Sequence, residues 1–320
     1  MASTSQTKVV LIGLDCAEPT LVFDRYRDKL PNLSRLAADG IWGELRSCDP
    51  PITVPAWMSM MSSKDPGTLG FTGFRNRADY SYDKLSIVSS RSVREPLLWD
   101  MLGEAGKRVI VLGVPQTYPP RPVSGVLVSG FLTPSLKSEY TYPAELKGEI
   151  AETVGPYLFD IPDFRTDEKP RLRRDLWRMT EQRFELAHHL LRTRPWDFFM
   201  MVEMGTDRVH HGFWRHMDPA HPKYVPGNEW EDVIEQHYIH VDAQIGRLLD
   251  ELPDDTTVLV VSDHGATALQ GGICVNEWLI QQGYLVLQEY PAEVTRPAEL
   301  KIDWPKTRAW GEGGYYGRVF

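Results

Sequence analysis

The sequence predicts an α/β protein in which helices flank a mostly parallel central sheet. Two observations lead to this prediction. Four apolar runs have the length and β-branched content of buried strands, and helical patterns alternate with these runs as in βαβ units. The chain has 320 residues, of which 42% are hydrophobic, so it is long enough to bury a large core. We therefore expect residues 1–320 to form a single domain.

In the first half of the chain, strands and helices follow one another closely. The segment KVVLIGLD (8–15) has the pattern of a buried strand, and LPNLSRLAADG (30–40) that of a short helix closed by a glycine. The segment IWGELRS (41–47) alternates apolar and polar residues, which predicts another strand. REPLLWDMLGEAGKRVIVLGVP (94–115) then predicts a helix, a glycine stop and a buried strand.

The second half repeats the pattern. RPWDFFMMVEMGTD (194–207) predicts a further buried strand, and residues 228–253 a long amphipathic helix that leads into a fully buried strand within TTVLVVSDHGAT (256–267). The stretches 64–92 and 116–170 are rich in Pro, Gly, Tyr and Ser. Because their periodicity is weak, we expect them to be insertions that form a lid over the sheet.

Charge and cysteine content exclude several classes of protein. The net charge of -9 and the absence of a long basic run argue against duplex nucleic acid as the main partner. The three cysteines form no CxxC pair, so neither a disulfide framework nor a thiolate zinc site is indicated. The first residues do not resemble a signal peptide, and no segment has the apolar length of a membrane span. We expect a cytoplasmic protein.

Three of the predicted buried strands run into an aspartate. These are Asp15, Asp207 and Asp263. Since the carboxyl ends of parallel strands meet at one edge of a sheet, the three carboxylates are expected to face a common electropositive ligand. His264 directly follows Asp263, and His211 follows Asp207 by one helical turn, so each pair is able to bind one metal ion. The alternative for each pair alone is a polar loop or surface turn after a core strand.

Thr53 precedes VPAWMSMM, a predicted helix with proline near its first turn. It therefore occupies the position of an N-cap, and capping is one interpretation of the residue. The other is chemical. A hydroxyl at a helix N-terminus faces free amides and the positive end of the dipole, where a phosphate would bind. A metal ion at its oxygen would lower the hydroxyl pKa and make the threonine a nucleophile.

The order of these residues resembles the type I phosphodiesterase/nucleotide pyrophosphatase family of the alkaline-phosphatase superfamily. GLDCAEP, PAWMSMMSSKDPG and SDHGA are each similar to family motifs, and the match spans almost the whole chain. The resemblance implies an alkaline-phosphatase-like fold and a hydrolase of phosphodiester or pyrophosphate bonds in small, nucleotide-like substrates. It implies two divalent metal ions, usually zinc, with manganese or iron as the other candidates, and a phospho-threonine intermediate formed on Thr53.

The resemblance also implies the ligands. One metal is expected to be held by Asp15, Asp263, His264 and the Thr53 oxygen. The other is expected to be held by Asp207, His211 and a histidine late in the family's chain.

No histidine follows His264, which departs from the family pattern. The final segment TRAWGEGGYYGRVF stops at Phe320 in a strand-like pattern, so we expect the sequence to be truncated there and the second metal to be bound weakly. A water molecule or His216 is the alternative third ligand. The family spacing selects His211, which gives its neighbour His210 a supporting role.

Two further assignments concern the substrate. Asn76, in GFTGFRNRADYSYD, falls where the family places an asparagine that donates to a free oxygen of the phosphate; a turn asparagine is the alternative. Trp57, Phe74 and Tyr80 lie near the threonine motif and are candidates for stacking on a base. Helical spacing makes Trp57 an equal candidate for the core.

Other functions remain as alternatives. A sulfatase is disfavoured, because sulfatases need a cysteine or serine in a C/S-x-P-x-R signature and this chain has Thr-Val-Pro-Ala-Trp. A phosphomonoesterase or phosphomutase of the same superfamily is the closest alternative. A metal-poor binding protein on a hydrolase scaffold is supported by the missing histidine. The sequence does not define an oligomeric state.

Overall fold

The computed structural model describes residues 7–79, 84–314 and 316–320, and the chain divides into two compact units. Unit 1 comprises Met1–Asn76 and Ser86–Ala268, and unit 2 comprises Arg77–Leu85 and Leu269–Phe320. Every predicted metal ligand lies in unit 1. The expectation of one domain over the whole chain stays a prediction.

A six-stranded sheet in the order β6-β5-β4-β7-β1-β8 forms the centre of unit 1. All neighbouring pairs are parallel except β5 and β6, which are antiparallel. The mostly parallel sheet predicted from the sequence is therefore confirmed. Its strands are β1 (Val9–Leu14), β4 (Val109–Leu112), β5 (Gly125–Val128), β6 (Thr141–Tyr142), β7 (Phe198–Glu203) and β8 (Thr257–Val261).

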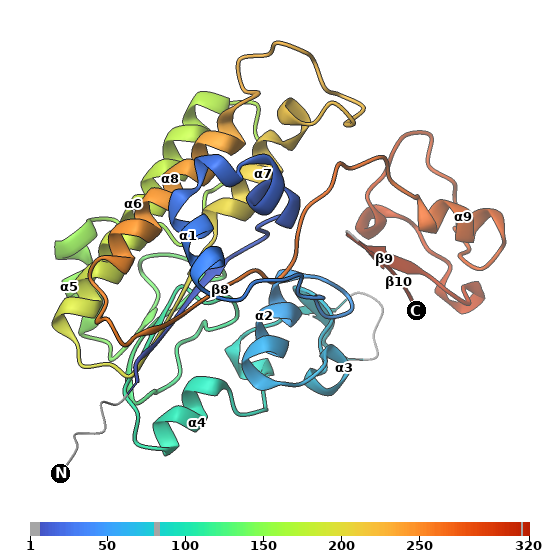
Figure 1. Cartoon of the computed structure of the whole chain (residues 1–320). Helices are drawn as coiled ribbons and strands as arrows, with labels where there is room; N and C mark the ends of the chain where they lie inside the picture. The colour runs from blue at the N-terminus through green and yellow to red at the C-terminus, as the bar shows by residue number, and fades with distance from the viewer. Residues whose placement is uncertain (1–6, 80–83, 315) are drawn as a thin grey trace. The chain divides into compact units, whose positions relative to one another are not determined.

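Helices cover both faces of this sheet (Figure 1). One face carries α1 (Pro31–Asp39), α5 (Leu146–Val154), α6 (Lys169–Thr193), α7 (Gly205–Met217) and α8 (Val233–Leu249). The other carries α2 (Thr53–Ser62), α3 (Pro66–Leu69) and α4 (Leu98–Glu104). The helices predicted within 30–40, 94–115 and 228–253 correspond to α1, α4 and α8.

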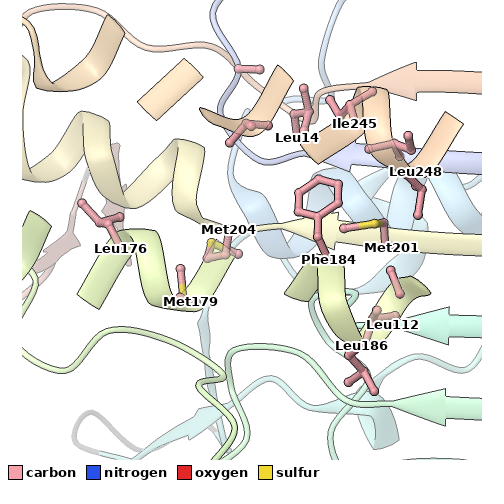
Figure 2. Packing of buried hydrophobic residues seen from close by; sticks show 14 of the residues in the cluster. Leu14, Leu112, Leu176, Met179, Phe184, Leu186, Met201, Met204, Ile245 and Leu248 are labelled. Carbon is pink, nitrogen blue, oxygen red and sulfur yellow. The ribbon is translucent and has the colours of Figure 1, made fainter. Parts of the chain in front are cut away.

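Alternation along β1 divides the hydrophobic residues between the two faces. Val10, Ile12 and Leu14 point to the layer of α6, α7 and α8, whereas Leu11 packs with α2 on the opposite face. Figure 2 shows Leu14 in the first of these cores, near Ile245 of α8. A strand that is buried on both faces reads as a continuous apolar run, which explains why β1, β4 and β7 were recognisable in the sequence.

One strand prediction was wrong, and another was wrong in part. The segment 41–47 is not a strand, and the side chains of Ile41 and Leu45 are exposed. The β8 strand exists, but among the described strands it pairs with β1 alone and lies at the edge of the sheet, so Leu259 is 45% exposed. The uniformly apolar sequence of β8 therefore did not indicate burial on both faces.

The two predicted insertions contain part of the scaffold. Residues 116–170 include β5 and β6, so this stretch completes the central sheet and is not only an insertion beside it. Residues 64–92 include α3, β2 (Arg75–Arg77) and β3 (Leu85–Ile87). A lid role for either stretch stays a prediction.

Unit 2 consists of short elements. It includes α9 (Val275–Gln281) and an antiparallel hairpin of β9 (Gly311–Gly313) and β10 (Gly317–Val319), where the sequence suggested a strand-like end. The rings of Trp310 and Phe320 pack at the base of the hairpin, 4.9 Å apart. In the described parts of the chain, no helix has both the length and the apolarity that a membrane span requires.

Candidate metal centre

The order β7-β1-β8 brings the three predicted aspartates to one edge of the sheet. Asp15 directly follows β1, and Asp263 lies two residues after β8. Asp207 lies in the first turn of α7, which begins two residues after the end of β7. Because these strands are parallel neighbours, their carboxyl ends lie side by side, as expected from the sequence.

Asp15 and Asp263 each have one carboxylate oxygen that accepts a hydrogen bond and one that does not. The indole Nε1–H of Trp57 donates to Asp15 Oδ2 over 2.7 Å, and the backbone N–H of Cys16 donates to Asp263 Oδ1 over 3.0 Å. The other oxygens, Asp15 Oδ1 and Asp263 Oδ2, are buried and have no hydrogen-bond partner among the described residues. Buried carboxylate oxygens without a partner are costly, which points to a ligand that completes them.

His264 completes a group of three converging side chains. Its Nε2 lies 3.8 Å from Asp15 Oδ1 and 3.4 Å from Asp263 Oδ2, and one ligand atom from each residue lies within 4.8 Å of the others. The His264 Nδ1 is 3.0 Å from the Gly265 carbonyl, which only accepts, so the proton belongs on Nδ1. The Nε2 lone pair is then available to a metal ion, and this donor set fits a divalent cation.

The electrostatics of the site also favour a cation. Burial, together with the charges of Asp263 and Asp207, raises the pKa of Asp15 well above its usual range. Burial likewise raises the pKa of Asp263 to about 8. Both shifts express the cost of holding several carboxylates in a poorly hydrated pocket, a cost that a bound cation offsets.

Thr53 lies next to this group. It is the first residue of α2, whose N-cap is Ile52, so the predicted N-cap position was wrong by one residue. Its Oγ1 lies 3.1 Å from His264 Nε2, and the residue is 7% exposed. The N–H groups of Thr53 and Val54 precede the first α-helical hydrogen bond, from Ala56 N to the Ile52 carbonyl. Two backbone donors and the positive end of the helix dipole therefore lie beside the hydroxyl.

Asp207 and His211 lie together but have a different environment. His211 Nε2 is 3.5 Å from Asp207 Oδ1 across one turn of α7, while Asp207 Oδ2 accepts a hydrogen bond from Arg208. Burial raises the pKa of Asp207, but the charges of Arg208 and of the nearby histidines His211, His264 and His210 together outweigh it, and the net shift is downward. In the described chain, the group of three converging ligands does not include this pair.

Arg208 links Asp207 to the segment before α6. Its Nε and Nη2 donate to Asp160 over 2.6 and 2.8 Å, and the guanidinium lies over the Phe164 ring at 4.2 Å. Arg208 is 7% exposed, so this is a largely buried charge network. Breaking such a network by removing one partner leaves an uncompensated charge inside the protein.

Replacing Arg208 with methionine should lower the free energy of unfolding by about 3 kcal/mol, because the Asp207 carboxylate stays buried without its partner. Urea unfolding measures the change. Arg215→Met is the matched control on the same helix: Arg215 pairs with Asp167, whose side chain is 90% exposed. We expect it to cost less than about 1 kcal/mol. Equal losses for both variants would contradict a structural role for the Arg208 network.

The other histidines singled out in the sequence have structural partners. His210 lies between Cys16 Sγ at 3.4 Å and the Tyr238 hydroxyl at 3.1 Å. Burial lowers the pKa of His210 to about 3, so its ring is neutral. His216 Nδ1 contacts Asn228 Oδ1 at 3.2 Å. Neither histidine belongs to the converging ligand group.

The predicted substrate contacts have mixed outcomes. Trp57 is fully buried, so its assignment as a base-stacking residue was wrong and the core alternative was right. Phe74 packs edge-on against Phe131, with ring centroids 6.0 Å apart. Tyr80 lies outside the described residues. Asn76 donates to the Gly70 carbonyl over 2.8 Å, and its contact with a phosphate stays a prediction.

Sequence reasoning missed three groups that shape the site. The Trp57 indole and the Cys16 amide orient the two aspartates, and Arg208 neutralises Asp207. Weak signals existed: Trp57 follows Thr53 by one helical turn, and Arg208 follows Asp207 directly. Neither spacing alone separates such a role from ordinary packing.

The mostly parallel sheet is covered by helices on both faces and carries the acidic residues at the carboxyl ends of its strands, as expected for an alkaline-phosphatase-like α/β fold. Residues 9–312 match the family described as type I phosphodiesterase / nucleotide pyrophosphatase. The chain belongs to this family, as the sequence motifs indicated. Comparison with curated proteins gives no match.

Two similar solved structures are complexes of phosphonoacetate hydrolase from Sinorhizobium meliloti 1021. The complex with phosphonoformate has a TM-score of 0.58 and 18% sequence identity, and the complex with phosphonoacetate has 0.59 and 19%. Each alignment covers 90% of this chain and 66% of the hydrolase chain. At this identity the likeness supports the fold, and the chain spans slightly less than two thirds of the hydrolase.

Proposed function

We propose that this chain is a divalent-metal-dependent hydrolase of phosphodiester or pyrophosphate bonds. Its substrates are proposed to be small and nucleotide-like, and its nucleophile to be Thr53. The observation that carries the proposal is the convergence of Asp15 Oδ1, Asp263 Oδ2 and His264 Nε2, with Thr53 Oγ1 at 3.1 Å from the imidazole nitrogen. Family membership supports the same class of reaction.

The ligand set fits a divalent cation, which would lower the pKa of the Thr53 hydroxyl and withdraw charge from the phosphoryl oxygens. The Thr53 hydroxyl loses its proton to solvent and its oxygen forms a bond to phosphorus, while the bond from phosphorus to the leaving oxygen breaks and the leaving group keeps the electron pair. A water molecule then attacks phosphorus from the vacated side and loses a proton, while the bond from phosphorus to the Thr53 oxygen breaks and the threonine takes up a proton. The amides of Thr53 and Val54 and the Asn76 side chain are proposed to stabilise the equatorial oxygens.

Asp207 and His211 are proposed as ligands of a second, more weakly held ion. They supply two protein ligands, whereas a catalytic zinc site normally keeps three, and one Asp207 oxygen is already engaged by Arg208. We therefore assign no chemical step to this pair. Zinc is the first candidate for the tighter position, with manganese and iron as the other candidates.

Metal-reconstituted turnover tests the proposal. The chelator-treated chain is assayed with and without Zn²⁺ or Mn²⁺ on bis(4-nitrophenyl) phosphate, 4-nitrophenyl phosphate and thymidine 5′-(4-nitrophenyl phosphate). We expect metal-dependent hydrolysis with a higher kcat/KM for the diesters than for the monoester. Faster monoester hydrolysis would favour the phosphomonoesterase alternative. Metal binding without turnover of any substrate would favour a binding protein.

A further inference from the structure

We propose that Trp57 is a positioning residue for the metal ligand Asp15. Its indole N–H holds Asp15 Oδ2 and thereby directs Asp15 Oδ1 at the site shared with Asp263 and His264. This inference rests on the proposed function, because it requires a divalent ion at these three ligands.

The contact is well suited to fix a carboxylate. The Nε1–Oδ2 distance is 2.7 Å, and Trp57 and Asp15 are both 0% exposed, so water does not compete for either atom. An indole N–H only donates, and its acceptor here is ionised when metal is bound, which makes the hydrogen bond charge-assisted. With Oδ2 engaged, Asp15 has one oxygen left for the ion.

Trp57 does for Asp15 what a backbone amide does for Asp263: each donates a hydrogen bond to one carboxylate oxygen. The equivalent oxygen of Asp263 is held by the Cys16 amide, which no side-chain substitution other than proline removes. The orientation of Asp15 depends on an indole that a substitution does remove. A substitution of Trp57 therefore tests whether the orientation of Asp15 matters for metal binding.

The indole is held in place by β1 itself. A Cβ at Gly13 would lie 2.4 Å from Trp57 Cη2 and 2.9 Å from Val202 Cγ2, so only glycine leaves room for the ring against the strand. Gly13 lies two residues before Asp15, and Thr53 lies one helical turn before Trp57. The ring thus joins the strand that carries the ligand to the helix that carries the proposed nucleophile.

A loss of metal affinity in Trp57→Phe tests the proposal. Phenylalanine keeps a ring in the core but has no N–H, so the Asp15 carboxylate is free to rotate. We expect the Kd for Zn²⁺ to rise by about 10- to 100-fold, the usual effect of removing a group that orients a ligand. Trp99→Phe is the matched control: Trp99 is 2% exposed in the same hydrophobic core. Its Kd should change by less than about twofold if orientation of the ligand is what matters.

A double-mutant cycle separates orientation from general loosening of the core. In an Asp15→Ala background there is no carboxylate to orient, so adding Trp57→Phe should leave the residual Kd unchanged. The proposal is overturned if Trp57→Phe alone binds Zn²⁺ like the wild type, or if its effect persists in full without Asp15. Failure of the wild-type chain to bind any divalent ion would instead contradict the proposed function.

If Trp57→Phe does not fold, NMR of the wild-type chain labelled with ¹⁵N-indole tryptophan gives the same answer. The Trp57 indole N–H is assigned through the protons of its own ring, whose Cη2 and Cζ3 atoms lie against Gly13. We expect this indole N–H to shift when Zn²⁺ is added, because an ion bound at Asp15 Oδ1 changes the electron density on the carboxylate that accepts its hydrogen bond. An unchanged Trp57 signal in a chain saturated with Zn²⁺ overturns the proposal.

Discussion

Replacing Thr53 with alanine should lower turnover of bis(4-nitrophenyl) phosphate by at least about a thousandfold, because the substitution removes the proposed nucleophile. Thr53 is the first residue of α2, and its Oγ1 lies 3.1 Å from His264 Nε2, beside the free carboxylate oxygens of Asp15 and Asp263. Initial rates at saturating metal measure the effect. The Kd for Zn²⁺ should change less than the rate, because three protein ligands remain.

Thr153→Ala is a matched control for this substitution. Thr153 lies on α5, and its hydroxyl donates to the Glu149 carbonyl of the same helix. The control should keep the wild-type rate. Near wild-type turnover in folded, metal-loaded Thr53→Ala would remove Thr53 as the nucleophile and leave its hydroxyl as a structural contact of His264.

The Asp263→Asn substitution should separate metal binding from folding. Asp263 supplies a buried, unpartnered oxygen to the ligand group, so the neutral amide should weaken Zn²⁺ binding and catalysis by at least about a hundredfold. The metal-free protein should be at least as stable as wild type, since the substitution removes a carboxyl that is costly to ionise in a buried pocket that also holds Asp15 and Asp207. Thermal unfolding with and without Zn²⁺ measures both effects.

The stability gain from Zn²⁺ distinguishes a ligand from a core residue. A ligand that binds only the folded state raises Tm in proportion to the logarithm of its concentration over Kd, so the gain in Asp263→Asn should shrink or vanish. Asp197→Asn is the control at the opposite end of the sheet, where Asp197 Oδ2 accepts from the Arg108 amide. A wild-type Tm gain in Asp263→Asn would contradict its assignment as a ligand.

The sequence predicted the strands correctly where an uninterrupted apolar run corresponds to burial on both faces of the sheet. The β1 and β7 strands are covered on both faces, so their uninterrupted apolar sequences identified central strands of a parallel sheet. The β8 sequence has the same character, yet the strand lies at the sheet edge. Composition alone does not record how many faces a strand buries. The alternation of apolar and polar residues in 41–47 likewise does not by itself specify a strand.

The sequence predicted which residues of the candidate site lie close together, but not how their side chains are oriented. A carboxylate after each of three apolar strands locates the edge of the sheet, and the following histidines select metal chemistry. Which carboxylate oxygen remains free depends on long-range partners. The indole that holds Asp15 is 42 residues away, and Asp160, which binds Arg208, is 48 residues away. Such pairings follow from the three-dimensional packing and are absent from local sequence patterns.

Calorimetric titration of Zn²⁺ into the chelator-treated chain is the most direct measurement of the central claim, that Asp15, Asp263 and His264 form one nearly complete metal site. We expect about one ion to bind tightly per chain at neutral pH, with further binding only at high Zn²⁺ concentration, because Asp207 and His211 supply two ligands. The absence of tight binding would contradict the site. Two ions bound with equal affinity would contradict the expectation that Asp207 and His211 bind metal more weakly than Asp15, Asp263 and His264.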